Sequence, residues 1–419
     1  MRARWLLPLL MACGATDAGD ADDQDWLDGK GDGASAVDVA ATHLDVDIST
    51  NTAVATIELE KNGNVELEIG DLTIDSVVDD RGNRRFKAED GKLRVSQVRG
   101  AMTITYSFLG HDMANGLLPG GSTVIWPYFC GNLFPCHSKP ADGTRFTLAL
   151  TGVPENKTAI FPEAIDNDAP PYQLAWAVGS YQRIDLGTTD AGTKVFTSYL
   201  PNGESVARRG TAHLVQVFDW YEKNLGPYTF GDEVGSVSVI WGEGFFGGME
   251  HHPYWHVARE AMGDELTHAH EAAHGWFGDG VRIRCWEDFV LSEGTTSYLS
   301  ARALSIADPT QEAAIWRGYQ DELDAAIADG GAPAWPEGCN QIDIIKDNLF
   351  TNLPYMQGAF FYKDVADEVG AEVLDGVIGR FYQKHKNQAA GMQDMLDAIR
   401  SETGFDATAI AEARLRKKF

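Results

Sequence analysis

Hydrophobic and polar residues alternate with a period of two from about residue 37 to residue 195. The apolar members of the clearest runs are Leu44, Val46 and Ile48; Val65, Leu67 and Ile69; Met102, Ile104, Tyr106 and Phe108; and Phe146, Leu148 and Leu150. Successive side chains of a β-strand point to opposite faces, so this pattern predicts strands with one buried face. Because turn residues separate the runs, we expect an antiparallel β domain over residues 37–195.

The hydrophobic period changes after about residue 196. Residues 210–224 carry apolar side chains at helical spacing, residues 236–241 fit a strand, and helical patterns dominate from residue 259 onward. Further helices are predicted over residues 309–328, 357–368, 372–385 and 392–403. The sequence therefore predicts a multidomain α+β protein whose second domain, residues 196–419, is mostly helical.

Residues 270–274 read His-Glu-Ala-Ala-His, inside a proline-free, alanine-rich segment that favours a helix. Positions i and i+4 share one helix face, so His270 and His274 can bind one Zn²⁺ at about 2.0–2.1 Å. Glu271 is offset around the helix and can act as general base toward the attacking water. A catalytic zinc takes three protein ligands, and Glu293, on a second predicted helix, is the candidate third. The alternative is a buried helix with two hydrogen-bonded histidines.

These residues and their neighbours resemble the aminopeptidase N family of zinc metallopeptidases. The matching elements are residues 270–279 with Trp286 and Ser292-Glu293-Gly294, the segment Gly247-Gly248-Met249-Glu250-His251, which is similar to the family's Gly-x-Met-Glu-Asn, and Tyr355-Met356-Gln357-Gly358-Ala359, which is similar to its Tyr-x-x-Gly-Ala. Looser similarity runs from about His43 to the last residues. The resemblance implies a saddle-like β sandwich followed by a thermolysin-like catalytic domain.

The resemblance implies a role for each matched residue. His270, His274 and Glu293 would hold one zinc ion per chain, and Glu271 would deprotonate the water. Tyr355 would donate a hydrogen bond to the oxyanion, although Tyr298 or Tyr362 is an alternative donor. Glu250 would bind the free α-amino group of a peptide substrate, with a surface carboxylate as the alternative. Gly247, Gly248 and Met249 would lie on an edge strand beside the substrate backbone.

Three departures from the family pattern matter. His251 replaces the usual Asn, and His251, His252, His256 and His268 crowd the region, either as surface or supporting groups or as a second metal site. Residues 117–135 contain neither the Gln nor the Glu that many relatives direct at the substrate amine.

An aminopeptidase is the first functional hypothesis. Because the second contact to the substrate amine is missing, an endopeptidase or a peptidase of relaxed end-preference is the second. A binding protein without catalysis is the third.

Composition and charge limit the classes of binding partner. Of the 419 residues, 44% are hydrophobic and 23% are charged, as in globular proteins. The formal net charge of −28 argues against binding to nucleic acid and against adsorption to anionic lipid. The preferred interpretation of this acidity is a solvated surface that favours solubility, and attraction for cationic peptides is the alternative. The sequence gives no indication of oligomeric state.

The amino terminus resembles an export signal. Arg2 and Arg4 precede the apolar stretch 5–12, and Cys13 ends a sequence similar to a bacterial lipoprotein box. We expect a signal over residues 1–13 with lipid on Cys13, and a disordered acidic linker over residues 14–36. The protein would then be an outer-membrane lipoprotein that touches the membrane only through its anchor. An ordinary signal peptide, with a periplasmic or extracellular product, is the alternative.

Four further cysteines remain, and an even set in an exported protein favours disulfides. Three pairings are possible. We expect Cys130–Cys136, which closes a short loop, and Cys285–Cys339 within the second domain. Zinc ligation by cysteine is the alternative.

Overall fold

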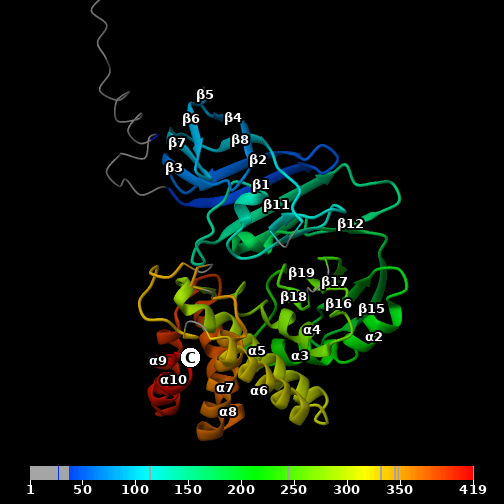
Figure 1. Ribbon diagram of the computed structural model, residues 1–419, viewed down its shortest axis with the longest axis vertical. Helices are drawn as coiled ribbons and strands as arrows, with labels where there is room; N and C mark the ends of the chain where they lie inside the picture. The colour runs from blue at the N-terminus through cyan, green and yellow to red at the C-terminus, as the bar shows by residue number, and fades with distance from the viewer. Residues whose placement is uncertain are drawn as a thin grey trace, which may run out of the picture.

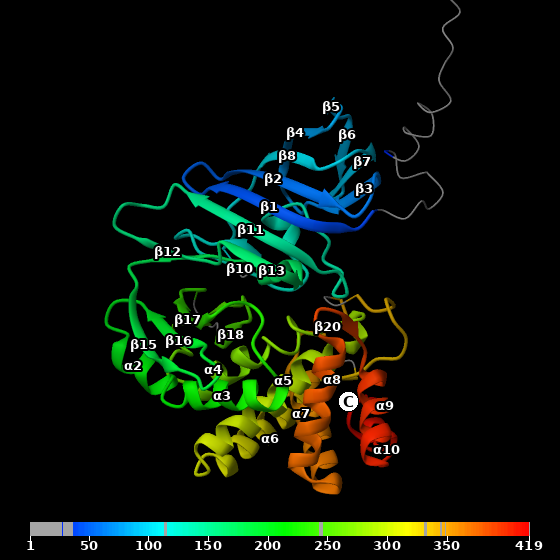
Figure 2. The same cartoon turned by 180° about the vertical axis from the view of Figure 1, so that it is seen from behind.

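The structure is a computed structural model that describes residues 27, 37–112, 115–242, 246–330, 333–343, 346–347 and 349–418. The predicted signal with Cys13, and the predicted linker apart from Leu27, lie outside the described residues. Figures 1 and 2 show a β-rich part stacked on a mainly helical part along the long axis of the molecule. This arrangement is the predicted multidomain α+β fold.

The amino-terminal part is built on a seven-stranded sheet in the order β13-β11-β1-β2-β8-β4-β5, with a three-stranded sheet β3-β7-β6 beside it. The strands are β1 Val39–Asp47, β2 Thr52–Leu59, β3 Gly63–Glu68, β4 Thr73–Asp79, β5 Gly82–Asn83, β6 Phe86–Glu89, β7 Lys92–Val98, β8 Met102–Ser107, β11 Thr144–Thr151 and β13 Ala164–Ala169. Met102, Ile104 and Tyr106 are fully buried, whereas Thr103 and Thr105 between them are not. The expectation of a purely antiparallel domain was wrong in one respect, because β1 pairs with β11 in parallel.

Short elements complete this part of the chain. They are β9 Asn115–Leu117, β10 Thr123–Ile125, β12 Thr158–Ile160, β14 Ala177–Gly179 and the 3-10 helices η1 Cys130–Asn132 and η2 Pro171–Gln173. The connection between β10 and η1 carries Trp126 and Pro127 toward the second part.

The second part opens with a five-stranded sheet in the order β15-β16-β17-β19-β18. Its strands are β15 Gln182–Thr188, β16 Lys194–Tyr199, β17 Glu233–Val239, β18 Gly248–Met249 and β19 Tyr254–Ala258. The predicted domain boundary at residue 195 falls inside β16, which pairs with β15 and β17. The sheet therefore begins before that boundary, and strand periodicity alone did not reveal which sheet β15 and β16 join.

Helices form the rest of the second part. They are α2 Glu204–Gly210, α3 Leu214–Leu225, α4 Glu265–Ala273, α5 Phe289–Ala307, α6 Glu312–Asp329, α7 Asn352–Val369, α8 Ala371–His385, α9 Met392–Thr403 and α10 Thr408–Arg414, with η3 Trp286–Asp288 and the small pair β20 Arg282–Ile283 and β21 Ala389–Ala390. The predicted helix 210–224 starts only at Leu214, because α2 ends at Gly210. In both views α7 to α10 lie on the side away from β15 and β16. No described helix is both long and apolar enough to cross a membrane.

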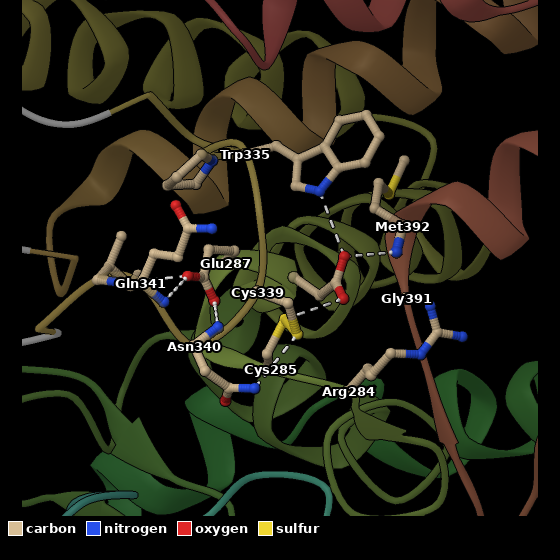
Figure 3. Close-up of a disulfide and its surroundings, with 12 residues drawn as sticks. Arg284, Cys285, Glu287, Trp335, Cys339, Asn340, Gln341, Gly391 and Met392 are labelled. Carbon is tan, nitrogen blue, oxygen red and sulfur yellow. Dashed lines mark hydrogen bonds between the residues drawn. A yellow bond between two sulfur atoms is a disulfide. The ribbon is translucent and has the colours of Figure 1, made fainter.

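Both expected disulfides are present in the structure, Cys130–Cys136 and Cys285–Cys339. The second joins the residue before η3 to the segment 333–343. Figure 3 shows Glu287 directed at the backbone of that segment, where its carboxylate accepts N–H hydrogen bonds from Asn340, Gln341 and Ile342 at 2.6–3.1 Å. The segment is thus fastened by one covalent bond and three hydrogen bonds to Cys285 and to η3, directly before α5.

Candidate active site

Three donor atoms from two helices converge at the centre of the second part. Nε2 of His270 lies 3.1 Å from Oε2 of Glu293, Nε2 of His274 lies 3.3 Å from the same oxygen, and the two imidazole nitrogens are 3.2 Å apart. His270 comes from α4, His274 directly follows that helix, and Glu293 lies on α5. The predicted metal ligands therefore meet at one point.

This triangle of donors fits a zinc ion. In a tetrahedron with bonds of about 2.0–2.1 Å, neighbouring ligand atoms lie about 3.3–3.4 Å apart. Nδ1 of His274 donates to the carbonyl of Phe277 at 2.9 Å, which leaves its Nε2 free to face a metal. Burial raises the pKa of Glu293, but His274 and His270 outweigh burial and bring it to about 2, so this carboxylate is charged.

The charges around these donors also call for a cation. Four buried carboxylates, those of Glu250, Glu271, Asp279 and Glu293, lie near two imidazoles. Burial lowers the pKa of His274, yet Glu250 and Glu293 outweigh it and raise that pKa well above its usual value. A divalent ion at the three donor atoms would supply the positive charge that the side chains lack.

Glu271 lies beside the donor triangle rather than in it. Its carboxylate forms a second cluster with Glu250 and His274, in which the donor atoms are within 4.8 Å of one another. Burial raises the pKa of Glu271 well above its usual value, with His274 opposing this and Glu250 adding to it. A carboxylate with a raised pKa next to the metal donors is suited to accept a proton from water.

The two glycines before Met249 serve different purposes. Gly247 has a φ of +112° and open space where a Cβ would stand. Gly248, in the edge strand β18, packs directly on Glu271, because a Cβ there would lie 2.4 Å from Cγ of that side chain. Glycine at 248 is therefore set by close approach, and glycine at 247 by backbone conformation.

Glu250 is buried, with 4% of its surface exposed, so the surface alternative for this residue was wrong. Burial raises its pKa, His274 lowers it and Glu293 raises it. Its place next to Glu271 and His274 puts a carboxylate at one side of the metal donors, where a cationic group of a ligand can reach it.

Tyr355, and neither alternative tyrosine, lines the same cavity as the metal donors. Its ring stacks on His270 at 5.9 Å between centroids, and burial together with Glu293 raises its pKa well above the usual value. The rings of Tyr298 and Tyr362 contact each other at a tilt away from this cavity, and the Tyr362 hydroxyl accepts a hydrogen bond from Thr295. Tyr355 therefore presents a protonated hydroxyl next to the donors.

The four crowded histidines are all buried, so a surface position for them was wrong. His252 links Tyr228 to the backbone carbonyl of Glu271 at 2.7 Å, and His268 hydrogen-bonds to the carbonyl of Met262. None of the four belongs to a group of three metal-binding side chains among the described residues. His252 and His268 thus bind backbone carbonyls around the site, and the described residues give no second metal centre built on these histidines.

The cavity that holds these groups measures about 500 Å³. Gly247, Gly248, Met249 and Glu250 line it, together with the metal donors, Glu271 and Tyr355. From the amino-terminal part it receives Trp126 and Pro127, which are not acidic. Trp126 and Pro127 belong to residues 117–135, so the segment that lacks Gln and Glu is the one that reaches the cavity.

Residues 258–413 match the peptidase family M1 domain, and this range contains the donor triangle, Glu271 and Tyr355. The chain carries an M1 peptidase domain. Its relatives bear names of that kind: leucine aminopeptidase 2 of Neurospora crassa is 31% identical over 64% of this chain and 43% of its own length. Human endoplasmic reticulum aminopeptidase 1 is 21% identical over 67% of this chain and 32% of its own length. The chain thus matches less than half the length of these curated relatives.

The fold agrees with a solved M1 zinc metallopeptidase from Deinococcus radiodurans. The TM-score is 0.75 at 18% identity, and the match covers 92% of this chain and 95% of that one. The resemblance to a zinc metallopeptidase family is confirmed, as is the order of a β-rich part followed by a helical part.

The site contains groups to which the sequence pattern assigned no role. Asp279 is fully buried, neither of its carboxylate oxygens has a hydrogen-bond partner among the described residues, and burial followed by Glu250 raises its pKa well above the usual value. Tyr172, from η2, lies close enough to Glu250 to affect its pKa. Asp279 is the last residue of the motif 270–279, so the motif could have identified it. Nothing in the sequence pointed to Tyr172.

Proposed function

We propose that this chain is a zinc-dependent aminopeptidase that removes the first residue of peptides. The observation that carries the proposal is the convergence of His270, His274 and Glu293 on one point. Glu271, Glu250 and Tyr355 line the same cavity. We further propose one zinc ion per chain.

The residues divide the reaction among them. His270, His274 and Glu293 would hold the zinc ion, which would supply Lewis acidity toward the carbonyl and the water. Glu271 takes the proton of the attacking water and delivers it to the departing nitrogen. Tyr355 donates its hydroxyl hydrogen to the oxygen that becomes negative in the transition state. Glu250 pairs with the α-amino group and so sets which bond lies at the metal.

A direct experiment compares free and N-acetylated peptides. Zinc-loaded protein is expected to release the first residue of Leu-Ala-Ala and to leave acetyl-Leu-Ala-Ala intact. A chelator should stop hydrolysis, and added zinc should restore it. Glu271→Gln should keep zinc and lose turnover, which assigns the loss to the general base and not to loss of the metal. Absence of hydrolysis by protein with full zinc would instead support a binding protein.

A relaxed end-preference is the second candidate function. Trp126 and Pro127 reach the cavity from the amino-terminal part, and neither offers a second acidic contact to the amine. If Glu250 alone binds the amine, the preference for free over acetylated peptides is modest. Internal cleavage of acetylated peptides at a comparable rate would establish this reading over strict aminopeptidase action.

We also propose that the chain is exported and anchored through lipid on Cys13. The first residues support this proposal, because basic Arg2 and Arg4 are followed by an apolar stretch and then by Cys13. The two disulfides support export, because disulfides persist in oxidising compartments. Labelling with a radioactive fatty acid should mark the wild-type protein and not Cys13→Ala. Labelling of neither, with a shortened soluble product, would point to an ordinary signal peptide.

A further inference from the structure

The cavity continues beyond the metal donors to a group of acidic and hydroxyl side chains. This acidic end, as we call it, is lined by Asp264 and Thr267 of the α4 start, Ser297 of α5, Tyr319 and Glu322 of α6, and Asn352 of α7. The proposed aminopeptidase chemistry uses none of these six residues.

The acidic end and Glu250 lie toward opposite ends of α4. The carboxylate of Glu250 is within 4.8 Å of donor atoms of Glu271 and His274, near the last turn of the helix. Asp264 is the N-cap of the same helix, about 9 Å along its axis from His270 at 1.5 Å per residue. A peptide with its amino group at Glu250 and its first carbonyl at the metal donors therefore directs the following residue toward the acidic end.

The two ends of the cavity differ in chemistry along α5 as well. Phe289 lies one turn before Glu293, and Phe350 packs edge-on against both Phe289 and Trp126. Ser297 lies one turn after Glu293, on the same helix face. The end that receives the first side chain is thus aromatic, and the end beyond the cleaved bond is acidic.

The two carboxylates of the acidic end form no ion pair within the described part of the chain. Asp264 accepts hydrogen bonds from the backbone and hydroxyl of Thr267, and Glu322 accepts one from Asn352 at 3.3 Å. The described residues that line the cavity include no Lys or Arg. Burial and then the charge of Asp264 raise the pKa of Glu322, as expected for two carboxylates without a counter-ion.

A buried hydroxyl at the same end also lacks a partner. Ser297 is 1% exposed, and its Oγ has no hydrogen-bond partner among the described residues. The hydroxyl of Tyr319 bonds to the backbone carbonyl of Ser297 at 3.0 Å, so that carbonyl is already used while Oγ is available. Two carboxylates and a free hydroxyl together match the several N–H donors of an ammonium or guanidinium group.

We infer that the acidic end selects peptides with lysine or arginine at the second position, directly after the bond that is cleaved. The inference rests on the proposed aminopeptidase function. An extended peptide advances about 3.5 Å per residue, and the long flexible stem of lysine or arginine carries its charge further toward Asp264 and Glu322. A glutamate at the same position meets two like charges and is disfavoured.

The test compares Leu-Lys-Ala, Leu-Gln-Ala and Leu-Glu-Ala as substrates. Wild-type protein should hydrolyse the lysine peptide with a kcat/KM about tenfold above that of the glutamate peptide at low salt, and the ratio should fall as salt is added. Asp264→Asn with Glu322→Gln should bring the ratio to within about twofold. Glu322→Gln alone should lower the ratio about threefold, and this variant leaves the Asp264 cap of α4 intact. Asp321→Asn, an exposed charge on α6 outside the cavity, should keep the wild-type ratio.

The outcomes separate this inference from the function on which it rests. If zinc-loaded wild-type protein hydrolyses all three peptides equally well, the acidic end selects nothing and only this inference is overturned. If it hydrolyses none of them, the aminopeptidase proposal fails and the inference fails with it. Titration calorimetry with Glu271→Gln gives a second readout, in which the lysine peptide should bind about tenfold more tightly than the glutamate peptide.

Discussion

Gly294 on α5 and Gly358 on α7 meet backbone to backbone. A Cβ on Gly358 would lie 2.3 Å from the Cα of Gly294, and a Cβ on Gly294 would lie 2.6 Å from the Cα of Gly358. Gly294 follows Glu293 directly, and Gly358 comes one turn after Tyr355. This contact therefore fixes how closely the tyrosine hydroxyl approaches the metal donors.

Replacing Gly358 by alanine should separate the two helices. We expect Gly358→Ala to lower kcat by about 10² and the free energy of unfolding by about 1–3 kcal/mol, because a methyl group has no room there. The matched control is Gly318→Ala on α6, where a Cβ meets nothing within 4 Å. The free energy of unfolding of that variant should rise by up to about 1 kcal/mol, and its activity should equal that of wild type. Steady-state kinetics and thermal melts measure both, and wild-type kinetics in Gly358→Ala would contradict the argument.

Gly248→Ala should displace Glu271 without disturbing the metal donors. The new Cβ would lie 2.4 Å from Cγ of Glu271, and the φ of Gly248 is one that alanine adopts. We expect kcat to fall by about 10²–10³ while bound zinc, measured by elemental analysis, stays at the wild-type level. Loss of zinc together with activity would show that this strand supports the metal donors and not the general base.

Tyr355→Phe should lower kcat by about 10²–10³ with little change in KM, because the lost hydrogen bond forms in the transition state. Burial and the charge of Glu293 hold the pKa of Tyr355 well above its usual value, so this hydroxyl should not cause a fall in rate up to about pH 9. Tyr362→Phe is the control, since that buried tyrosine bonds to Thr295 away from the cavity. Tyr362→Phe should lower stability and leave kcat unchanged. An equal fall of kcat in both variants would contradict the role assigned to Tyr355.

Stability should decline as the pH falls from about 6.5 toward 4. Burial lowers the pKa of His252 to about 3, of His256 to about 3 and of His268 to about 4, so all three stay neutral in the fold. The unfolded chain binds these protons near pH 6.5, and each histidine therefore removes about 1.4 kcal/mol of stability per pH unit below that value. Urea unfolding at several pH values measures the slope. His256→Asn should make it shallower, and an unchanged slope would show that other groups dominate it.

The segment held by Cys285–Cys339 should depend on Glu287. Glu287→Ala leaves three backbone N–H groups without their acceptor, at a cost of about 1–3 kcal/mol, and should expose the segment 333–343 to protease (Figure 3). Glu337→Ala removes an exposed carboxylate of the same segment and should change neither property. Because this segment leads to Phe350 at the cavity, KM should rise in Glu287→Ala. Protection equal to that of wild type would mean that the disulfide alone holds the segment.

The sequence alone determined the parts of this protein that depend on local spacing. The i, i+4 relation put His270 and His274 on one face of a helix, and period-two alternation gave the strands with Leu44, Met102 and Phe146. The motif around Glu293 identified a third donor, but only the structure brought its oxygen to 3.1–3.3 Å from both imidazole nitrogens.

Tertiary structure decided what distant segments do to one another. Strand β15 has Ile184 and Leu186 at alternate positions, like the strands before it, and only the pairing of β15 with β16 and of β16 with β17 assigned it to the second sheet. The burial of His251 and Glu250, the fit of Gly248 against Glu271 and the opposed aromatic and acidic ends of the cavity have no local pattern. Each arises from packing between elements far apart in sequence, and packing depends on the shape of the whole core.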